Sequence, residues 1–164
     1  GGVIIDKLAK SGDKKAASFP MPKLDSAEHR YDVSFSGLKT AVIHQCDMFW
    51  NDDFEKSNEN MCAAFQETAC KTITSRLFRA VDDTGLKTVV AGGGVAANSR
   101  LRELLSERKD INCIFPPLKL CGDNGAMIAG VAYHFLMRGD RSGIDTTACA
   151  RIPQFKKGLQ LHRR

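Results

Sequence analysis

The stretch Val89-Val90-Ala91-Gly92-Gly93-Gly94-Val95-Ala96-Ala97-Asn98 carries the strongest fold signal in the chain. Apolar, β-branched residues that run into consecutive glycines predict a buried strand followed by a turn. Glycine lets backbone N–H groups approach an anion closely, and a helix that follows adds a favourable dipole. The stretch matches neither the Walker A pattern nor the dinucleotide fingerprint. Two interpretations therefore stay open, an anion-binding loop or a tight turn in which Asn98 is the N-cap of the next helix.

Helical and strand patterns alternate on both sides of this stretch. The expected elements are a helix from about 58 to a stop at Gly85, a strand at 87–91, a helix after Asn98, a strand at 111–115 and a helix at 124–138. This order is typical of an α/β layer with a parallel sheet. A sheet of so few strands would leave apolar helix faces uncovered. We therefore expect the chain to be incomplete, with further strands upstream.

The segment before the long helix is less regular. We expect a short helix at 3–11 that stops at Gly12, followed by an irregular connection from 12 to 30. A connection of that length is often functional or mobile. Large and polar residues alternate over 31–35, which predicts a strand. A helix is then predicted from Ser36 through Phe49.

The last predicted helix is apolar nearly all round, so we expect it to be buried on more than one side and to stop at Gly139. On this helix, His134 is expected to be a core or interface residue. Asp123 directly precedes the N-terminus of this predicted helix, where a carboxylate either caps the helix or serves as a ligand of a metal ion. A single carboxylate makes no metal site, and the sequence holds no H-x-x-x-H pair to complete one. By spacing alone the cap is favoured.

Composition indicates a soluble globular protein, since 43% of the residues are hydrophobic and 26% are charged. We find neither a membrane span nor a signal peptide, and the start at Gly1 without a methionine suggests a piece of a longer protein. The net charge of +5 fits either a polyanionic partner or an ordinary basic surface. Basic residues cluster at Arg100, Arg102, Arg108 and Lys109. The six cysteines have no zinc-ribbon spacing. We expect them to be reduced thiols, mostly buried inside a cytoplasmic protein.

Three separate motifs, in this order and spacing, resemble the C-terminal half of the TsaD-like family of tRNA threonylcarbamoyladenosine transferases. They are Phe35-Ser36-Gly37-Leu38-Lys39-Thr40, then Gly93-Gly94-Val95-Ala96-Ala97-Asn98-Ser99-Arg100-Leu101-Arg102, then Asp123-Asn124-Gly125-Ala126-Met127-Ile128-Ala129. The opening Gly1-Gly2 is similar to the family's proline-glycine-glycine segment. The resemblance covers residues 1–153, and 154–164 are expected to form a disordered tail.

The resemblance implies an actin-like, Hsp70-like ATPase fold built from two ribonuclease-H-like lobes around a nucleotide cleft. This chain would hold an incomplete pair of lobes. The implied activity is transfer of the threonylcarbamoyl group from threonylcarbamoyl-AMP to N6 of the adenosine 3′ to the anticodon in ANN-reading tRNAs. The implied cofactor is one divalent metal ion, iron or zinc. In bacteria the implied partners are a TsaB-like paralogue and a TsaE-like ATPase.

Site residues follow from the resemblance by matching the motifs. Gly2 and Asn98 correspond to substrate-contacting residues, and Gly93 and Gly94 fall in the nucleotide-proximal loop. Asp123 corresponds to the downstream metal ligand. The two histidine ligands and the early glycine-rich substrate loop of the family are missing from this sequence. We therefore expect an incomplete metal site and no activity of this chain alone.

Three alternatives compete with the transferase. The family has also been labelled a metallopeptidase or glycoprotease, but the sequence holds no H-E-x-x-H motif. A non-catalytic scaffold paralogue is disfavoured by the retained Asn98 and Asp123. A sugar kinase of the same superfamily is disfavoured by the motif match alone. No general base is identifiable, and Lys39 either reaches a phosphate or lies in solvent.

Overall fold

The computed structural model describes residues 1–21 and 29–147, and it divides the chain into two compact units. The first unit spans Gly1–Asp123 and the second Asn124–Arg164. The predicted domain boundary at 153 and the tail at 154–164 lie outside the described residues.

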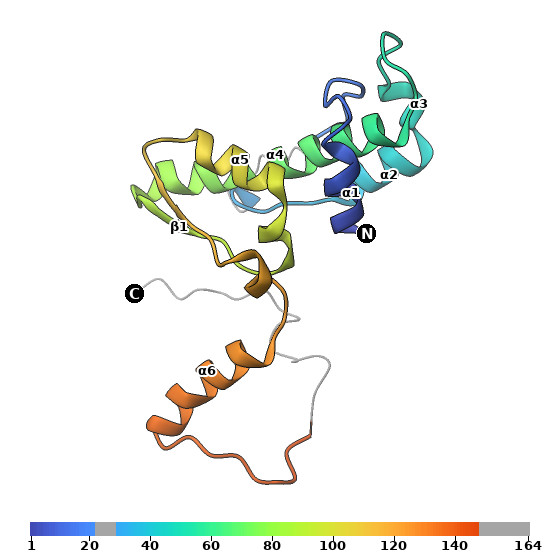
Figure 1. Ribbon diagram of the computed structural model, residues 1–164. Coiled ribbons are helices and arrows are strands. Elements are labelled where there is room, and N and C mark those ends of the chain that lie inside the picture. Colours follow the sequence, from blue (N-terminus) through green and yellow to red (C-terminus); the bar gives the residue numbers. More distant parts are fainter. Residues whose placement is uncertain (22–28, 148–164) are drawn as a thin grey trace. The chain divides into compact units, whose positions relative to one another are not determined.

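Helix α4, Asn58–Thr84, is the long element of the first unit, with α1 and α5 beside it (Figure 1). Its N-cap is Ser57, whose hydroxyl accepts a hydrogen bond from the backbone N–H of Asn60 at 3.2 Å. Gly85 ends the helix in the left-handed conformation at φ 70°, and its N–H donates to the carbonyl of Val81. Both the helix and its glycine stop are confirmed as predicted.

The most buried face of α4 is not the apolar stripe that the sequence predicts, in which Met61, Phe65, Ala69, Ile73 and Leu77 recur every four residues. Most of the stripe from Met61 to Leu77 is only half-buried. The buried positions are Ala63, Ala64, Gln66, Glu67, Thr68, Cys70, Thr72, Thr74 and Val81. The hydroxyl of Thr72 donates to the carbonyl of Thr68 at 2.8 Å, so burial of this side chain leaves no polar group unsatisfied. This polar face is buried because α1 and α5 pack along α4, and Asn98 and Arg100 at the start of α5 bond to Gln66 and Glu67.

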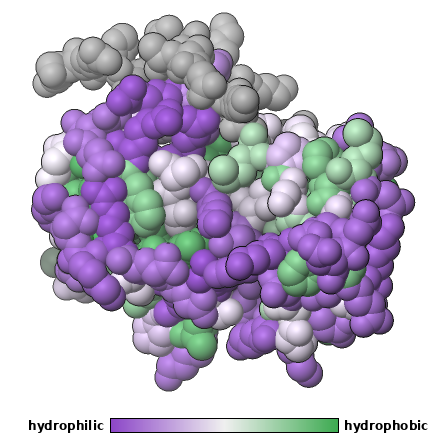
Figure 2. Space-filling model, turned by 90° about the horizontal axis from the view of Figure 1, so that it is seen from above, coloured by the Kyte–Doolittle hydropathy of each residue, from purple (hydrophilic) through white to green (hydrophobic). Residues whose placement is uncertain are grey.

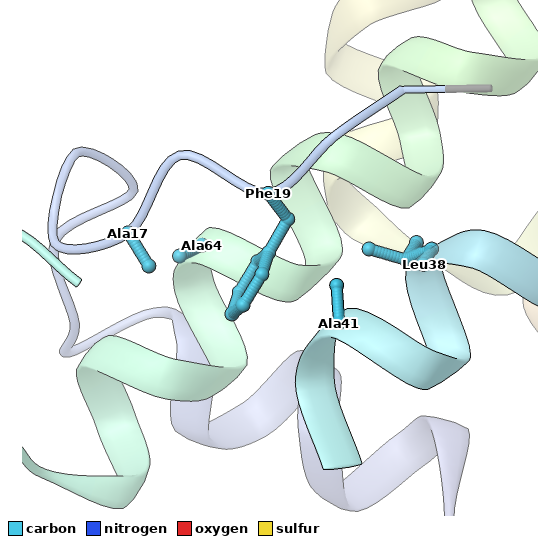
Figure 3. Packing of buried hydrophobic residues seen from close by; sticks show 5 residues of the cluster. All are labelled: Ala17, Phe19, Leu38, Ala41 and Ala64. Carbon is cyan, nitrogen blue, oxygen red and sulfur yellow. The ribbon is translucent and has the colours of Figure 1, made fainter. Parts of the chain in front are cut away.

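Three further helices precede α4: α1 (Gly2–Ala9), α2 (Ser36–His44) and α3 (Cys46–Phe49). The helix predicted from Ser36 through Phe49 is interrupted at Gln45, where φ −133° and ψ 20° leave the helical region. A hydrophobic cluster forms where α2 and the loop after α1 meet α4. In Figure 3 the ring of Phe19 lies between Ala64 of α4 and α2.

A two-stranded parallel sheet follows α4, as predicted. Strand β1 (Thr88–Val90) pairs with β2 (Asn112–Ile114), with Val89 opposite Cys113. Between them run the 3-10 helix η2 (Gly94–Ala97) and helix α5 (Ser99–Glu107), and η3 (Leu118–Leu120) comes after β2. Leu101, Leu104 and Leu105 of α5 pack with Cys70 of α4 in a second hydrophobic cluster. The connection thus has the strand, helix, strand order of a parallel α/β layer.

The strand predicted over 31–35 is wrong. Tyr31 lies in a turn and the next four residues up to Phe35 are irregular. No neighbouring strand exists for this segment among residues 1–21 and 29–147, and an extended segment without a partner forms no ladder. The hydroxyl of Tyr31 instead donates a hydrogen bond to the carboxylate of Asp83 on α4 at 2.9 Å. The same carboxylate forms an ion pair with Arg30.

The second unit contains helix α6, Gly125–Met137. Its N-cap is Asn124, whose side chain accepts from the N–H of Met127 at 3.0 Å, so the prediction that favoured Asp123 as the cap is wrong. Gly139, at φ 86°, is the predicted stop. The N–H of Gly139 donates to Leu136 and that of Asp140 to Phe135, which is the Schellman pattern.

The expected burial of α6 is also contradicted, because none of its residues is buried and His134 is exposed. Within residues 124–147, the described part of this unit, α6 is the only helix, so these residues provide no second element to cover its apolar side chains. Among the large hydrophobic residues of α6 that are exposed, the exposed fraction ranges from 45% at Met127 to 70% at Met137.

The expected burial of the thiols is met only in part, because Cys70 and Cys121 are buried whereas Cys46, Cys62 and Cys113 are half-buried. The face of the molecule in Figure 2 is mostly hydrophilic, with hydrophobic areas between the polar ones. Cys46, Cys62, Cys70, Cys113 and Cys121 are free, whereas Cys149 lies outside the described residues. No helix of the described residues has the length and apolarity required to cross a membrane.

Gly12 allows a close approach between the loop after α1 and α4, since a Cβ there would lie 2.0 Å from the carbonyl oxygen of Glu59. We expect Gly12→Ala to destabilise the protein by about 1–3 kcal/mol, because the loop after α1 must move away from α4. Gly37→Ala is the matched control, since its Cβ would meet nothing within 4 Å and alanine favours a helix. Urea unfolding of both variants measures the difference, and equal midpoints would contradict this account.

Candidate functional site

Asn98 lies at the junction of η2, α5 and α4. Its Oδ1 caps α5 by accepting from the N–H of Leu101 at 3.0 Å and also accepts from the thiol of Cys70 at 3.4 Å. Its Nδ2 donates to Oε1 of Gln66 at 2.8 Å. The N-cap interpretation of Asn98 is therefore confirmed, and the amide is fixed from both ends.

The next residue, Ser99, ties the start of α5 to α1. Both its backbone N–H and its hydroxyl donate to Oδ1 of Asp6, at 3.1 and 2.7 Å. A carboxylate at the first turn of a helix also interacts favourably with the helix dipole. Helix α1, which begins at Gly2, is thereby held against the segment that carries Asn98.

Arg100 anchors α5 to α4 through Glu67. Its Nε and a terminal nitrogen reach the two oxygens of Glu67 at 2.6 and 3.3 Å, and the side chain of Glu67 is only 9% exposed. Burial by itself would raise the pKa of Glu67, but hydrogen bonds from Arg100 and Lys71 outweigh burial and lower the pKa to about 2. The carboxylate is therefore charged at neutral pH.

Arg102 connects the segment after β1 with the segment after β2. Its guanidinium donates to the carbonyl of Ala96 at 2.7 Å, to that of Pro116 at 3.1 Å and to the sulfur of Cys121 at 3.4 Å. It also lies 4.6 Å from the ring centroid of Phe115. The residues just before Asp123 are thus fixed relative to η2.

The glycine loop requires glycine at one position in particular. Gly93 has φ 83° and ψ 174°, a conformation that L side chains rarely adopt. Gly92 and Gly94 have negative or extended φ, and a Cβ at either would meet nothing within 4 Å. The loop is therefore constrained by backbone conformation rather than by space.

A cavity of about 440 Å³ lies between α1, α2, α4 and η2. Its lining is almost entirely apolar, and the polar or charged residues Lys39, Gln66 and Asn98 are among those that line it. The lining residues are Gly2, Ile5, Phe35, Leu38, Lys39, Val42, Ile43, Phe65, Gln66, Ala69, Cys70, Ile73, Val95 and Asn98. A mostly apolar hollow with a few polar groups is the usual form of a small-molecule site.

The structure brings some of the predicted site residues together at this cavity. Gly2 and Asn98 line it, and Lys39 of the first motif does so as well. Gly93 and Gly94 directly precede Val95 in its wall, and Asp123 is not among its lining residues in the described part of the chain. The substrate role of these residues and the metal role of Asp123 stay predictions.

A complete metal site is not formed by the described residues. No group of three or more His, Cys, Asp or Glu side chains there could hold a metal ion. Asp123 is exposed and would supply one ligand. The residues present therefore do not by themselves fit the implied iron or zinc ion.

The basic cluster noted in the sequence is offset by acidic neighbours. Arg100 pairs with Glu67, Glu103 and Glu107. Arg108 pairs with Asp82 and Asp110. Because both arginines form ion pairs within the fold, the number of basic residues here is no argument for a surface that binds a polyanion.

Three residues that matter to this site carried no signal strong enough to be singled out in the sequence. Gln66, Glu67 and Asp6 each bond a residue of the Asn98-Ser99-Arg100 segment. The available hint was the polar Gln66-Glu67 pair directly after the apolar run from Met61 to Phe65.

These features define an α/β protein in which a glycine loop between parallel strands opens beside a small-molecule cavity. The family model for tRNA N6-adenosine threonylcarbamoyltransferase matches residues 1–130. The chain belongs to this family. The transferase of Treponema denticola is 62% identical over 161 residues, which cover 98% of this chain and 48% of the relative. Those of Treponema pallidum and Borrelia duttonii are 50% and 42% identical over 96% and 98% of this chain.

The chain spans about half the length of these curated relatives, between 45% and 48%. This agrees with the expectation that it corresponds to one half of a family member.

The buried Glu67 predicts a specific loss of stability in acid. Its folded pKa of about 2 lies below the ordinary 4.5, so its stabilising effect is complete above pH 4.5 and is lost as the pH falls toward 2. Glu67→Gln is expected to unfold more easily at pH 7 and to lose less further stability between pH 5 and pH 2.5. Glu103→Gln, at a 62% exposed partner of Arg100, is the control and should follow the unsubstituted protein. Identical pH profiles for all three proteins would refute the assignment.

Gly93 gives a second stability test. Gly93→Ala is expected to cost about 1–3 kcal/mol, because alanine is strained at a positive φ. Gly92→Ala, one residue earlier, should cost less because its φ is not positive. Denaturant midpoints of the two variants measure the difference, and a Gly93→Ala protein as stable as Gly92→Ala would rule out the backbone constraint.

Proposed function

We propose that this chain supplies part of the active site of an enzyme that transfers the threonylcarbamoyl group from threonylcarbamoyl-AMP to N6 of the adenosine 3′ to the anticodon in ANN-reading tRNAs. The observation that carries the proposal is the meeting of three separate segments at one cavity, represented by Gly2, Lys39 and Asn98. Family membership supports the same reaction. The whole protein would have the actin-like, two-lobed ATPase fold, of which this chain is an incomplete part.

The proposed chemistry makes modest demands on the protein. The carbonyl of an acyl-adenylate is already activated, because AMP is a good leaving group. An exocyclic adenine amine is a weak nucleophile, so the enzyme must chiefly hold the two reactants in line and stabilise charge on the leaving group. A rigid cavity wall suits the first of these tasks, and donors oriented toward the leaving group suit the second.

Asn98 is the side chain of this chain best suited to contact the acyl-adenylate. Leu101, Cys70 and Gln66 hold its amide in one orientation, so it loses little conformational freedom when a ligand binds. Gly2, at the first turn of α1, and the loop at Gly93 and Gly94 would bring backbone groups near the nucleotide.

Asp123 would be one ligand of a divalent iron or zinc ion, and two histidines from the remainder of the protein would complete the site. Such an ion would polarise the carbonyl or anchor the phosphate. The residues of this chain would then position the adenylate beside it. The further partners proposed are tRNA, a TsaB-like paralogue and a TsaE-like ATPase, all in the cytoplasm.

A chimera tests the proposed function. In it, this chain replaces the matching segment of the Treponema denticola relative, to which it is 62% identical. We expect the chimera to form threonylcarbamoyladenosine in tRNA when threonylcarbamoyl-AMP and the partner proteins of that relative are supplied. A folded chimera that binds tRNA but forms no product would favour a non-catalytic scaffold. Cleavage of glycoprotein or phosphorylation of sugar instead would favour the peptidase or the kinase.

Within the chimera, Asn98→Ser and Asp123→Asn are expected to lower kcat/KM by about a hundredfold or more, as losses of oriented polar groups do. Serine retains the N-cap of α5, so Asn98→Ser removes the amide without removing the cap. Ser57→Ala is the matched control, because it removes the N-cap of α4 and should lower stability without lowering the rate constant. Full activity of Asp123→Asn would overturn its assignment as a metal ligand.

A further inference from the structure

The amide of Asn98 can adopt only one of its two flipped orientations. The backbone N–H of Leu101 is a donor without acceptor capacity, so the atom that faces it at 3.0 Å must be Oδ1. The thiol of Cys70 donates to the same oxygen at 3.4 Å. Burial raises the pKa of Cys70 to about 11, so the thiol keeps its proton at neutral pH.

With Oδ1 fixed, Nδ2 of Asn98 faces Gln66, and the acceptor there must be an oxygen. Oε1 of Gln66 accepts this bond at 2.8 Å. Gln66 is 7% exposed and lies on α4 between Ala63 and Cys70 in the buried face. A hydrogen bond in such a poorly solvated position is stronger than the same bond in water, and leaving either amide unpaired there is costly.

Because an amide is planar, the direction of one Nδ2–H bond determines the direction of the other. We propose that Gln66 is a positioning residue, whose bond to Asn98 aims the second N–H of that amide at the ligand in the cavity that both side chains line. This inference rests on the proposed function, since it needs Asn98 to contact the acyl-adenylate. It assigns to Gln66 no contact with the reacting atoms.

The test compares substitutions of Gln66 in the full-length chimera. Gln66→Leu removes the acceptor at similar volume, and Gln66→Asn withdraws it by shortening the side chain. Gln66→Glu retains an acceptor oxygen for the Nδ2–H of Asn98. Thr72→Val is the matched control, because Thr72 is also buried on α4 but donates only to the carbonyl of Thr68 in its own helix.

The expected result is a rise of roughly tenfold in KM for threonylcarbamoyl-AMP with Gln66→Leu and Gln66→Asn, corresponding to the loss of one oriented hydrogen bond. Gln66→Glu should restore KM to within about threefold of the unsubstituted value. Thr72→Val should leave KM unchanged. Partial unfolding lowers the apparent kcat but not KM, since the remaining folded molecules are intact. Should Gln66→Leu not fold, Gln66→Asn and Gln66→Glu decide the matter.

A double-mutant cycle separates this inference from the proposed function. If Gln66 acts through Asn98, Gln66→Leu should raise KM no further in a protein that already carries Asn98→Ser. A further tenfold rise in that background, or an unchanged KM with Gln66→Leu alone, would overturn the positioning role. If Asn98→Ser itself leaves kcat/KM unchanged, the assignment of Asn98 in the proposed function fails instead.

Discussion

The bond between Arg100 and Glu67 is the interaction on which the geometry of the first unit depends. Both oxygens of a nearly buried carboxylate are engaged by one guanidinium, at the point where α5 begins beside α4. Removal of one partner of such a pair leaves an uncompensated charge, which typically costs about 3–5 kcal/mol. The pair therefore fixes the start of α5, and with it the side chain of Asn98. Through Ser99 the same junction also holds α1, whose first residue lines the cavity.

Local sequence signals were sufficient for much of this fold. Helix α4, the glycine stops at Gly85 and Gly139, and the two short strands each depend on residues close together in the chain. The predictions that were wrong concern segments whose structure depends on a packing or pairing partner that is far away in the sequence or absent from the described residues. Alternation over 31–35 is a necessary feature of a strand, but a strand also needs a neighbour. Burial of α6 likewise requires elements that residues 124–147 do not contain.

The candidate site was predictable only in part, for the same physical reason. Motifs identified Asn98, and its side chain both caps α5 and lines a cavity. Gln66 and Glu67 could not be selected from the sequence, because their partners are 32 and 33 positions away and buried polar residues on a helix resemble exposed ones in a pattern. Asp123 was expected as a helix cap by spacing, whereas Asn124 fills that role and leaves Asp123 outside the hydrogen-bond pattern of the helix start.

The two short strands have one covered side and one open side. Val89 is buried, whereas Val90 and Ile114 on the opposite side are 72% and 48% exposed. Parallel sheets in folded proteins are normally covered on both faces, and their outer strands present unpaired backbone groups along the edge. The open side with Val90 and Ile114, together with the strand edges, forms a surface with which another chain can pair. This chain by itself is therefore expected to self-associate at high concentration.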